Sequence, residues 1–206
     1  DNLTMLVAFL LPATIGAVAI AEPLYTVFYG KPDSLALGLF ILAMLQTIIL
    51  GLYTVLSPMI QALFQNRKAI LYFGYGVLVK LILQVPFIYV FKAYGPLLST
   101  TIGLMIPIVL MYKEIHQVTH FNRKTVFKRS LLTAILTLIM LLVVLVAGFI
   151  LGLVIKPNGR VTSMIYVALI GGVGIVVYGG LGLRLRFLDR FIGSKAASLR
   201  NKFHIS

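Results

Sequence analysis

One lysine lies near the middle of a long apolar stretch. The run of residues 69–91 contains Lys80 close to its midpoint and no other charged residue. At about 1.5 Å per residue the run is long enough to cross a hydrocarbon layer of about 30 Å, which places the ammonium group near the bilayer centre. A charge there costs roughly 2.5 to 3.5 kcal/mol on insertion scales. Lys80 is therefore the first candidate for a functional residue, and a structural lysine bonded to a neighbouring helix is the alternative.

Polar and small residues recur at helical spacing around this lysine. Gly76, Lys80 and Gln84 are four residues apart and share one helix face. A second polar face, on the preceding apolar run, consists of Gln46, Tyr53, Ser57 and Gln61. Prolines interrupt these runs, and each frees a backbone carbonyl that needs another partner. We therefore expect bent helices around a common cavity. The residues that we assign to substrate binding are Lys80, Gln84, Tyr53, Ser57 and Gln46.

Groups suited to catalysis or metal binding are scarce. His116 and His120 have the i, i+4 spacing of a helical metal pair, with Glu114 nearby as an oxygen ligand, but they stand in a basic loop that disfavours a cation. The absence of cysteine excludes disulfide and thiolate chemistry. The sequence also lacks a phosphate-binding loop, a G-x-S-x-G motif and paired carboxylates. We predict no metal site, no cofactor and no enzyme activity.

Composition indicates a membrane protein. Of the 206 residues, 60% are hydrophobic and 11% are charged, and the apolar residues form long blocks. These blocks predict an all-α integral membrane protein with six transmembrane helices. The predicted spans are residues 3–28, 35–63, 69–91, 97–112, 131–155 and 162–183. Because the chain begins without Met and without a signal peptide, we interpret it as a piece of a longer polypeptide.

Basic residues are distributed unequally between the two sides of these spans. One side carries thirteen: Arg67, Lys68, Lys113, Arg123, Lys124, Lys128, Arg129, Arg184, Arg186, Arg190, Lys195, Arg200 and Lys202. The other side carries four: Lys31, Lys92, Lys156 and Arg160. The positive-inside rule places the thirteen-residue side, and hence both termini, in the cytoplasm beneath the plasma membrane. Since the net charge of +13 is spread along loops, we predict no nucleic-acid partner.

The same pattern divides the chain into four parts. They are a four-helix part at 1–116, a basic cytoplasmic loop at 117–130, a terminal helix pair at 131–183 and a basic tail at 184–206. The tail sets apolar residues among basic ones, which predicts an interfacial amphipathic helix on anionic lipid, with a disordered tail as the alternative.

The sixth span is rich in glycine, which favours close helix contact. Its glycines form either a packing seam against the fifth span or a groove that faces lipid. The residues assigned to lipid contact are Gly171, Gly172, Arg184 and Arg186.

Three stretches resemble a known family. They are LLPATIGAVAIAEPLYTVFYG in the first span, LSPMIQALFQNRKA at the end of the second, and GVLVKLILQVPFIYVFKAYGPLLSTTIG across the third and fourth. They are similar to the polysaccharide and lipid II flippases of the multidrug/oligosaccharidyl-lipid/polysaccharide exporter superfamily. The similarity covers roughly residues 3–112, whereas the last two spans match only in number and hydrophobicity.

The resemblance implies the last six spans of a fourteen-span, two-lobed transporter that works by alternating access. Its substrate would be an undecaprenyl-pyrophosphate-linked sugar or peptidoglycan precursor carried from the cytoplasmic to the outer leaflet. Lys80 matches the lysine of the family's G-x-x-x-K stretch, where it would face the pyrophosphate. The partners implied are this lipid-linked oligosaccharide, membrane lipids and the N-terminal lobe of the same polypeptide. The terminal helix pair would hold the lipid tail.

Two other classes remain open. A cation-coupled multidrug antiporter of the same superfamily would keep an acidic residue in the membrane, and only Glu22 could serve, close to the outer surface. A non-transporting membrane scaffold would need no second lobe.

Overall fold

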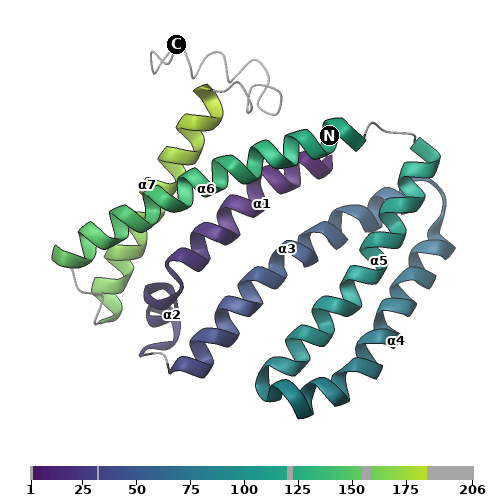
Figure 1. Cartoon of the computed structure of the whole chain (residues 1–206), viewed down its shortest axis with the longest axis horizontal. Helices are drawn as coiled ribbons and strands as arrows, with labels where there is room; N and C mark the ends of the chain where they lie inside the picture. Colours follow the sequence, from purple (N-terminus) through teal and green to yellow (C-terminus); the bar gives the residue numbers. More distant parts are fainter. Residues whose placement is uncertain (1, 32, 120–122, 155–158, 185–206) are drawn as a thin grey trace. The chain divides into compact units, whose positions relative to one another are not determined.

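The computed structural model describes residues 2–31, 33–119, 123–154 and 159–184, and within them every regular element is a helix (Figure 1). The expectation of an all-α chain is therefore confirmed for the described residues. The chain divides into two compact units. The first comprises Asp1–Leu10 and Asp33–Ser130, and the second comprises Leu11–Pro32 and Leu131–Ser206.

The first predicted span is broken into two helices. α1 (Asn2–Ala19) and α2 (Ala21–Tyr29) meet at an angle of 78°, so the predicted span over residues 3–28 is a pair of helices with a sharp bend between them. Pro23 explains the break, because its ring would clash with the carbonyl of Ala19 four residues earlier in a continuous helix. In the first turn of a new helix the missing N–H of a proline costs nothing, and Pro23 lies in that turn of α2.

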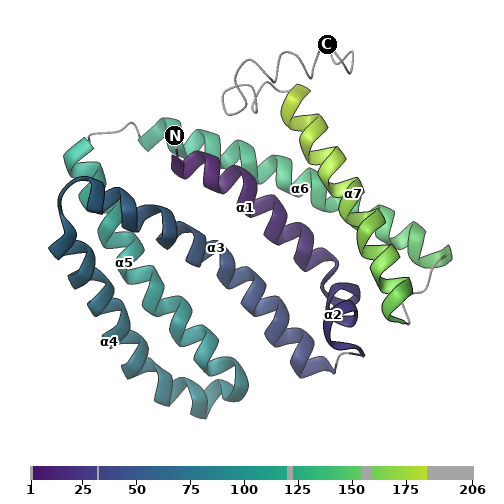
Figure 2. The same ribbon diagram turned by 180° about the vertical axis from the view of Figure 1, so that it is seen from behind.

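Three long helices form the first unit together with the start of α1. They are α3 (Ser34–Ala62), α4 (Asn66–Phe91) and α5 (Gly95–Thr119), and α5 packs along both α3 and α4 (Figures 1 and 2). The carboxylate of Asp33 caps α3 by accepting from the backbone N–H of Ala36 at 2.6 Å.

A short 3₁₀ turn, η1 (Lys92–Tyr94), reverses the chain between α4 and α5. Gly95 is required at the end of this turn, since a Cβ there would meet the backbone of Phe87 and Ile88. The result is a tight helical hairpin.

The core of the first unit lies at the opposite end of this hairpin. The buried cluster consists of Leu56, Ile60, Ala69, Met111 and Ile115, contributed by α3, α4 and α5. Leu3 of α1 packs against the cluster, and Leu10 lies over Gly51 of α3. α1 therefore joins the unit through apolar side chains that approach a glycine.

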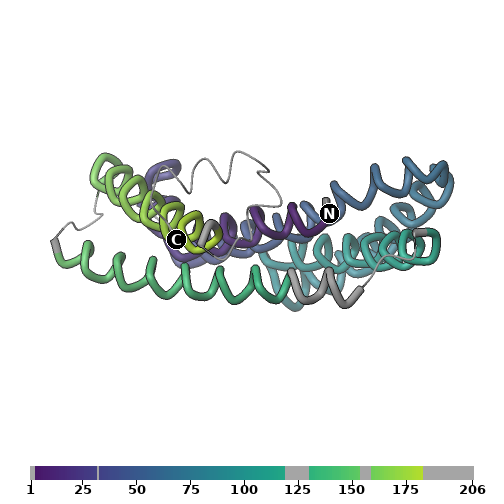
Figure 3. Tube along the Cα trace, turned by 90° about the horizontal axis from the view of Figure 1, so that it is seen from above, coloured from purple at the N-terminus to yellow at the C-terminus, as the bar shows by residue number. Residues whose placement is uncertain are grey.

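The second unit contains α1 from Leu11 onward, α2, α6 (Arg123–Val154, from Leu131 onward) and α7 (Arg160–Arg184). α6 is one uninterrupted helix, traced in Figure 3, and is buried along a single stripe: Thr133, Leu136, Thr137, Met140 and Val144. Its other faces expose large apolar side chains, as expected for a helix that faces lipid. The hydroxyl of Thr137 donates to the carbonyl of Thr133 at 2.8 Å, which satisfies it inside the stripe.

Within the part of the chain that the structure describes, four helical stretches are long and apolar enough to cross a membrane. They are Ser34–Ala62, Asn66–Val118, Ser130–Leu153 and Arg160–Gly182, and the bent pair α1–α2 raises the number to five if it counts as one span. The chain is thus a multi-pass membrane protein by helix length and composition, and a count of six spans stays a prediction.

Two helices are longer than the predicted spans. α5 continues to Thr119 and α6 begins at Arg123, so both extend into the 117–130 segment assigned to a loop. No glycine or proline stands between Pro107 and Gly148, so these helix breakers are absent from the parts of α5 and α6 that extend into this segment. His116 accordingly lies within α5 rather than in a loop, while His120 and the tail from 185 onward lie outside the described residues.

Candidate functional site

Lys80 lines a small cavity between α4 and α5. The cavity has a volume of about 110 Å³ and is lined by Phe73, Gly76, Val77, Lys80, Thr100, Gly103, Leu104 and Pro107. Lys80 supplies the only charge in this lining, and its side chain is partly buried. The ammonium-bearing side chain is therefore placed against a neighbouring helix and not simply on an open face of α4.

Two glycines bring the helices together at this point. A Cβ on Gly103 would lie 2.8 Å from the carbonyl oxygen of Gly76, and a Cβ on Gly76 would collide with the carbonyl oxygen of Gly103. The same added atom on Gly103 would lie 2.8 Å from the Cβ of Lys80. Small residues at a crossing allow backbones to approach closely within a membrane. The Cβ of Lys80 on α4 therefore lies close to the backbone of α5 at Gly103.

Pro107 changes the polarity of the cavity. A proline has no N–H to give to the residue four positions earlier, so the carbonyl of Gly103 lacks its usual helical donor. Pro107 is itself buried and lines the cavity beside Gly103. The hydroxyl of Thr100 is already used, since it donates to the carbonyl of Pro96 at 2.7 Å. The cavity therefore lies beside a stretch of α5 in which one backbone carbonyl lacks its helical donor.

The other predicted binding residues lie elsewhere. Tyr53 on α3 packs its ring on Phe73 of the cavity wall, with ring centroids 5.7 Å apart. Ser57 accepts a hydrogen bond from Gln61 at 3.2 Å. Gln46 on α3 and Gln84 on α4 are partly buried, and neither they nor Ser57 line the cavity. Of the predicted binding residues, Lys80 lines the cavity, and Tyr53 contacts the ring of Phe73 in its wall.

Some lining residues were missed at the level of sequence. Phe73 lies seven positions and Val77 three positions before Lys80. Thr100 lies seven positions and Leu104 three positions before Pro107. Each of these residues is three or seven positions from Lys80 or from Pro107, which places it on the same helix face. That spacing was the available signal, but only the packing of α4 on α5 shows that the two faces meet.

A second polar group closes the far end of the α4–α5 hairpin. Glu114 of α5 forms an ion pair with Lys68 of α4 and accepts a hydrogen bond from the hydroxyl of Tyr72 at 3.1 Å. The Lys68 side chain is 47% exposed and that of Glu114 is 14% exposed. Glu114 thus pairs with residues of α4. Among the described residues no group of three or more potential ligands could hold a metal ion.

Gly174 of α7 contributes to the seam with α6. A Cβ on Gly174 would lie 3.3 Å from the side chain of Val144, whereas Gly171 and Gly172 have no described neighbour within 4 Å. A further link between these helices is the hydroxyl of Tyr166, which donates to the carbonyl of Gly148 at 2.9 Å. The side chain of Arg184 and the whole of Arg186 lie outside the described residues.

These features define a multi-pass membrane protein in which a partly buried lysine lines a cavity between two helices. A curated protein of Bacillus subtilis (strain 168), described as lipid II flippase MurJ, is 31% identical to the chain over 191 residues. The match covers 90% of this chain and 35% of that protein, so the chain spans about a third of the length of this relative. The resemblance to the flippase family drawn from the three sequence stretches is thereby confirmed. No family model matches the chain, and no solved structure matches it.

Proposed function

We propose that the chain is the C-terminal part of a flippase that moves an undecaprenyl-pyrophosphate-linked sugar or lipid II from the inner to the outer leaflet. The observation that carries this proposal is the position of Lys80 in a cavity between two apolar helices. A pyrophosphate that crosses hydrocarbon needs a counter-charge within the membrane, and hydrogen bonds between ammonium and phosphate oxygens are among the strong ones. The likeness to a protein described as a lipid II flippase supports the same reading.

Lys80 would act as a point charge that binds the pyrophosphate during alternating access. A lysine suits this role because its compact ammonium group on a flexible stem can follow a moving anion, whereas the planar fork of arginine imposes one geometry. Gly76 and Gly103 set where the stem begins. Gln84, one turn further along α4, and Gln46, Tyr53 and Ser57 on α3 would offer hydrogen bonds to the rest of the head group.

The proposal includes a topology. The stretch Asn66–Val118 holds 53 residues and contains α4, η1 and α5, which is about 80 Å of helix and far more than one crossing needs. We propose that it crosses twice, which makes six crossings and leaves both termini cytoplasmic in a bacterial plasma membrane. Residues 1–116 would belong to the C-terminal lobe, with 117–130 and 184–206 as cytoplasmic segments.

The lipid tail would lie against the terminal helix pair at 131–183. The glycine face at Gly171 and Gly172 has no described neighbour within 4 Å, which leaves room for an acyl or prenyl chain there. Arg184 and Arg186 would contact head groups. The remaining eight spans would come from the N-terminal part of the same polypeptide.

The test is complementation of a flippase-depleted cell by the full-length protein. Lys80→Met keeps most of the stem and removes the charge, so we expect normal membrane expression, because an insertion cost of roughly 2.5 to 3.5 kcal/mol is relieved, and lost transport. Lys80→Arg should retain partial function. Lys92→Met, at the exposed end of the hairpin, is the matched control and should transport normally. Full rescue by Lys80→Met at wild-type expression would leave Lys80 with a structural role only.

A further inference from the structure

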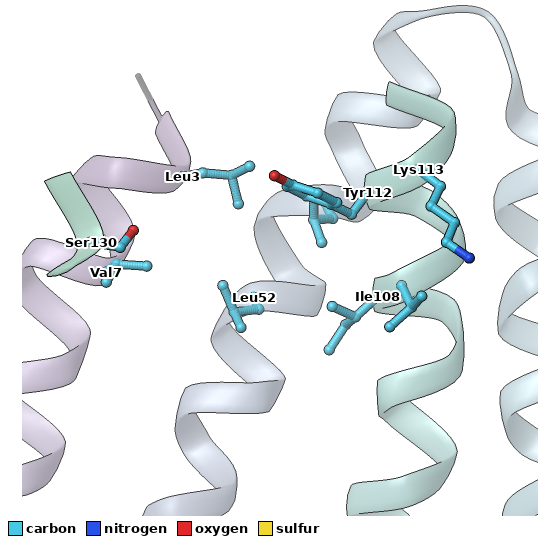
Figure 4. Close-up of a pocket in the computed structure, with 9 residues that line it drawn as sticks. Leu3, Val7, Leu52, Ile108, Tyr112, Lys113 and Ser130 are labelled. Carbon is cyan, nitrogen blue, oxygen red and sulfur yellow. The ribbon is translucent and has the colours of Figure 1, made fainter. Parts of the chain in front are cut away.

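A second and larger pocket lies in the first unit. Its volume is about 400 Å³, and α1, α3, α5 and the first described side chain of α6 line it: Leu3, Val7, Leu52, Leu56, Ile108, Val109, Tyr112, Lys113 and Ser130 (Figure 4). It shares no residue with the cavity that contains Lys80. The two are therefore separate sites.

This pocket is apolar in its depth and polar at one end. Leu56 at its base is buried, and Val109 on its wall is 47% exposed, so the pocket reaches the protein surface. Figure 4 shows the side chains of Leu3, Leu52 and Ile108 around a shared space, while the ammonium group of Lys113 points away from it. Lysine thus contributes its stem to the wall and keeps its charge at the surface.

The chemistry of the lining selects the occupant. Water needs two to four polar partners, which this apolar wall does not provide, whereas an acyl chain needs none. Lipid tails are as apolar as the lining itself, so preference for one lipid over another must come from its head group. The polar end supplies positive charge in Lys113. The nearby carboxylate of Glu114 is already paired with Lys68.

We propose that this pocket binds one acyl chain of an anionic phospholipid from the leaflet on the Lys113 side. The phosphate lies at the surface end of the pocket, beside Lys113, and the chain extends between α1, α3 and α5. The lipid here is a resident component of the membrane and not the transported substrate. Its binding does not depend on Lys80.

Photo-crosslinking in the full-length protein tests the site. Benzoylphenylalanine at Val109 is compared with the same residue at Ile135 on α6, because these positions are 47% and 46% exposed and Ile135 does not line the pocket. The protein is placed in bilayers of phosphatidylglycerol and phosphatidylethanolamine, irradiated, and its adducts are identified by mass spectrometry. We expect phosphatidylglycerol adducts at Val109 well above its share of the bilayer, and adducts at that share at Ile135.

Removal of the charge provides the second measurement. Lys113→Gln should lower the phosphatidylglycerol enrichment at Val109 about fivefold, the effect of one basic residue near a membrane surface. Lys92→Gln should leave it unchanged. Adducts at Val109 with another part of the polypeptide, adducts with an undecaprenyl lipid, or adducts with no preference for phosphatidylglycerol would each overturn the proposal.

Discussion

Alanine at position 103 tests whether the glycine crossing positions the lysine. The added methyl group would lie 2.8 Å from both the carbonyl oxygen of Gly76 and the Cβ of Lys80, about 0.6 Å short of ordinary contact at 3.4 Å. Neither atom is the free end of a flexible side chain, so α4 and α5 must separate. Overpacking of this kind costs about 1 to 3 kcal/mol. Gly103→Ala should therefore lower the free energy of unfolding and displace the Lys80 stem.

Gly74→Ala on α4 is the matched control, because a Cβ there meets nothing within 4 Å. Both variants share the gain in helix propensity of roughly 1 kcal/mol, so the difference between them isolates the crossing. We expect Gly103→Ala to be less stable than Gly74→Ala by about 1 to 3 kcal/mol in detergent unfolding of the full-length protein, and to transport less at equal expression. Equal stability and transport of the two variants would refute the role of the crossing.

Three further predictions concern other contacts and the topology. Glu114→Ala should destabilise the protein more than Lys68→Ala, by about 0.5 to 1.5 kcal/mol in the same unfolding assay, because it also removes the acceptor of the Tyr72 hydroxyl; equal losses would contradict the shared role of the carboxylate. Tyr166→Phe should cost about 0.6 to 1.7 kcal/mol, since it removes a hydrogen bond between α6 and α7 inside the membrane, and an unchanged unfolding midpoint would argue against that bond. Single cysteines at either end of the 206-residue segment, in a cysteine-free full-length background, should resist an impermeant reagent applied outside intact cells; labelling of either end would exclude cytoplasmic termini.

The helices with clear sequence boundaries were predictable. α3 runs over Ser34–Ala62 against a predicted span of 35–63, because an acidic cap precedes an uninterrupted apolar block. Lys80 could also be recognised as a candidate functional residue from its position near the middle of an apolar run. What the sequence could not show is which atoms face it, because contact with Gly103 depends on how α5 packs against α4.

The break after Ala19 illustrates a different limit. Pro12, Pro58, Pro86 and Pro107 all lie within helices that continue through them, whereas Pro23 coincides with a bend of 78°. Each proline lacks the backbone N–H that would donate one hydrogen bond within a continuous helix. Tertiary packing then decides whether the chain bends slightly or starts a new helix. The pocket beside Leu56 was likewise invisible in sequence, since it requires α1, α3 and α5 to assemble around it.

Closure of the α4–α5 hairpin at both ends bears on how the chain enters the membrane during synthesis. The turn at Gly95 and the pair formed by Lys68 and Glu114 hold the two helices together over their whole length. When only α4 has been synthesised, the side chain of Lys80 has no neighbouring α5 beside it. Its stem is covered only after Gly103 of α5 has also been synthesised. We therefore expect α4 to partition into the bilayer together with α5, and its insertion efficiency to depend on residues synthesised after it.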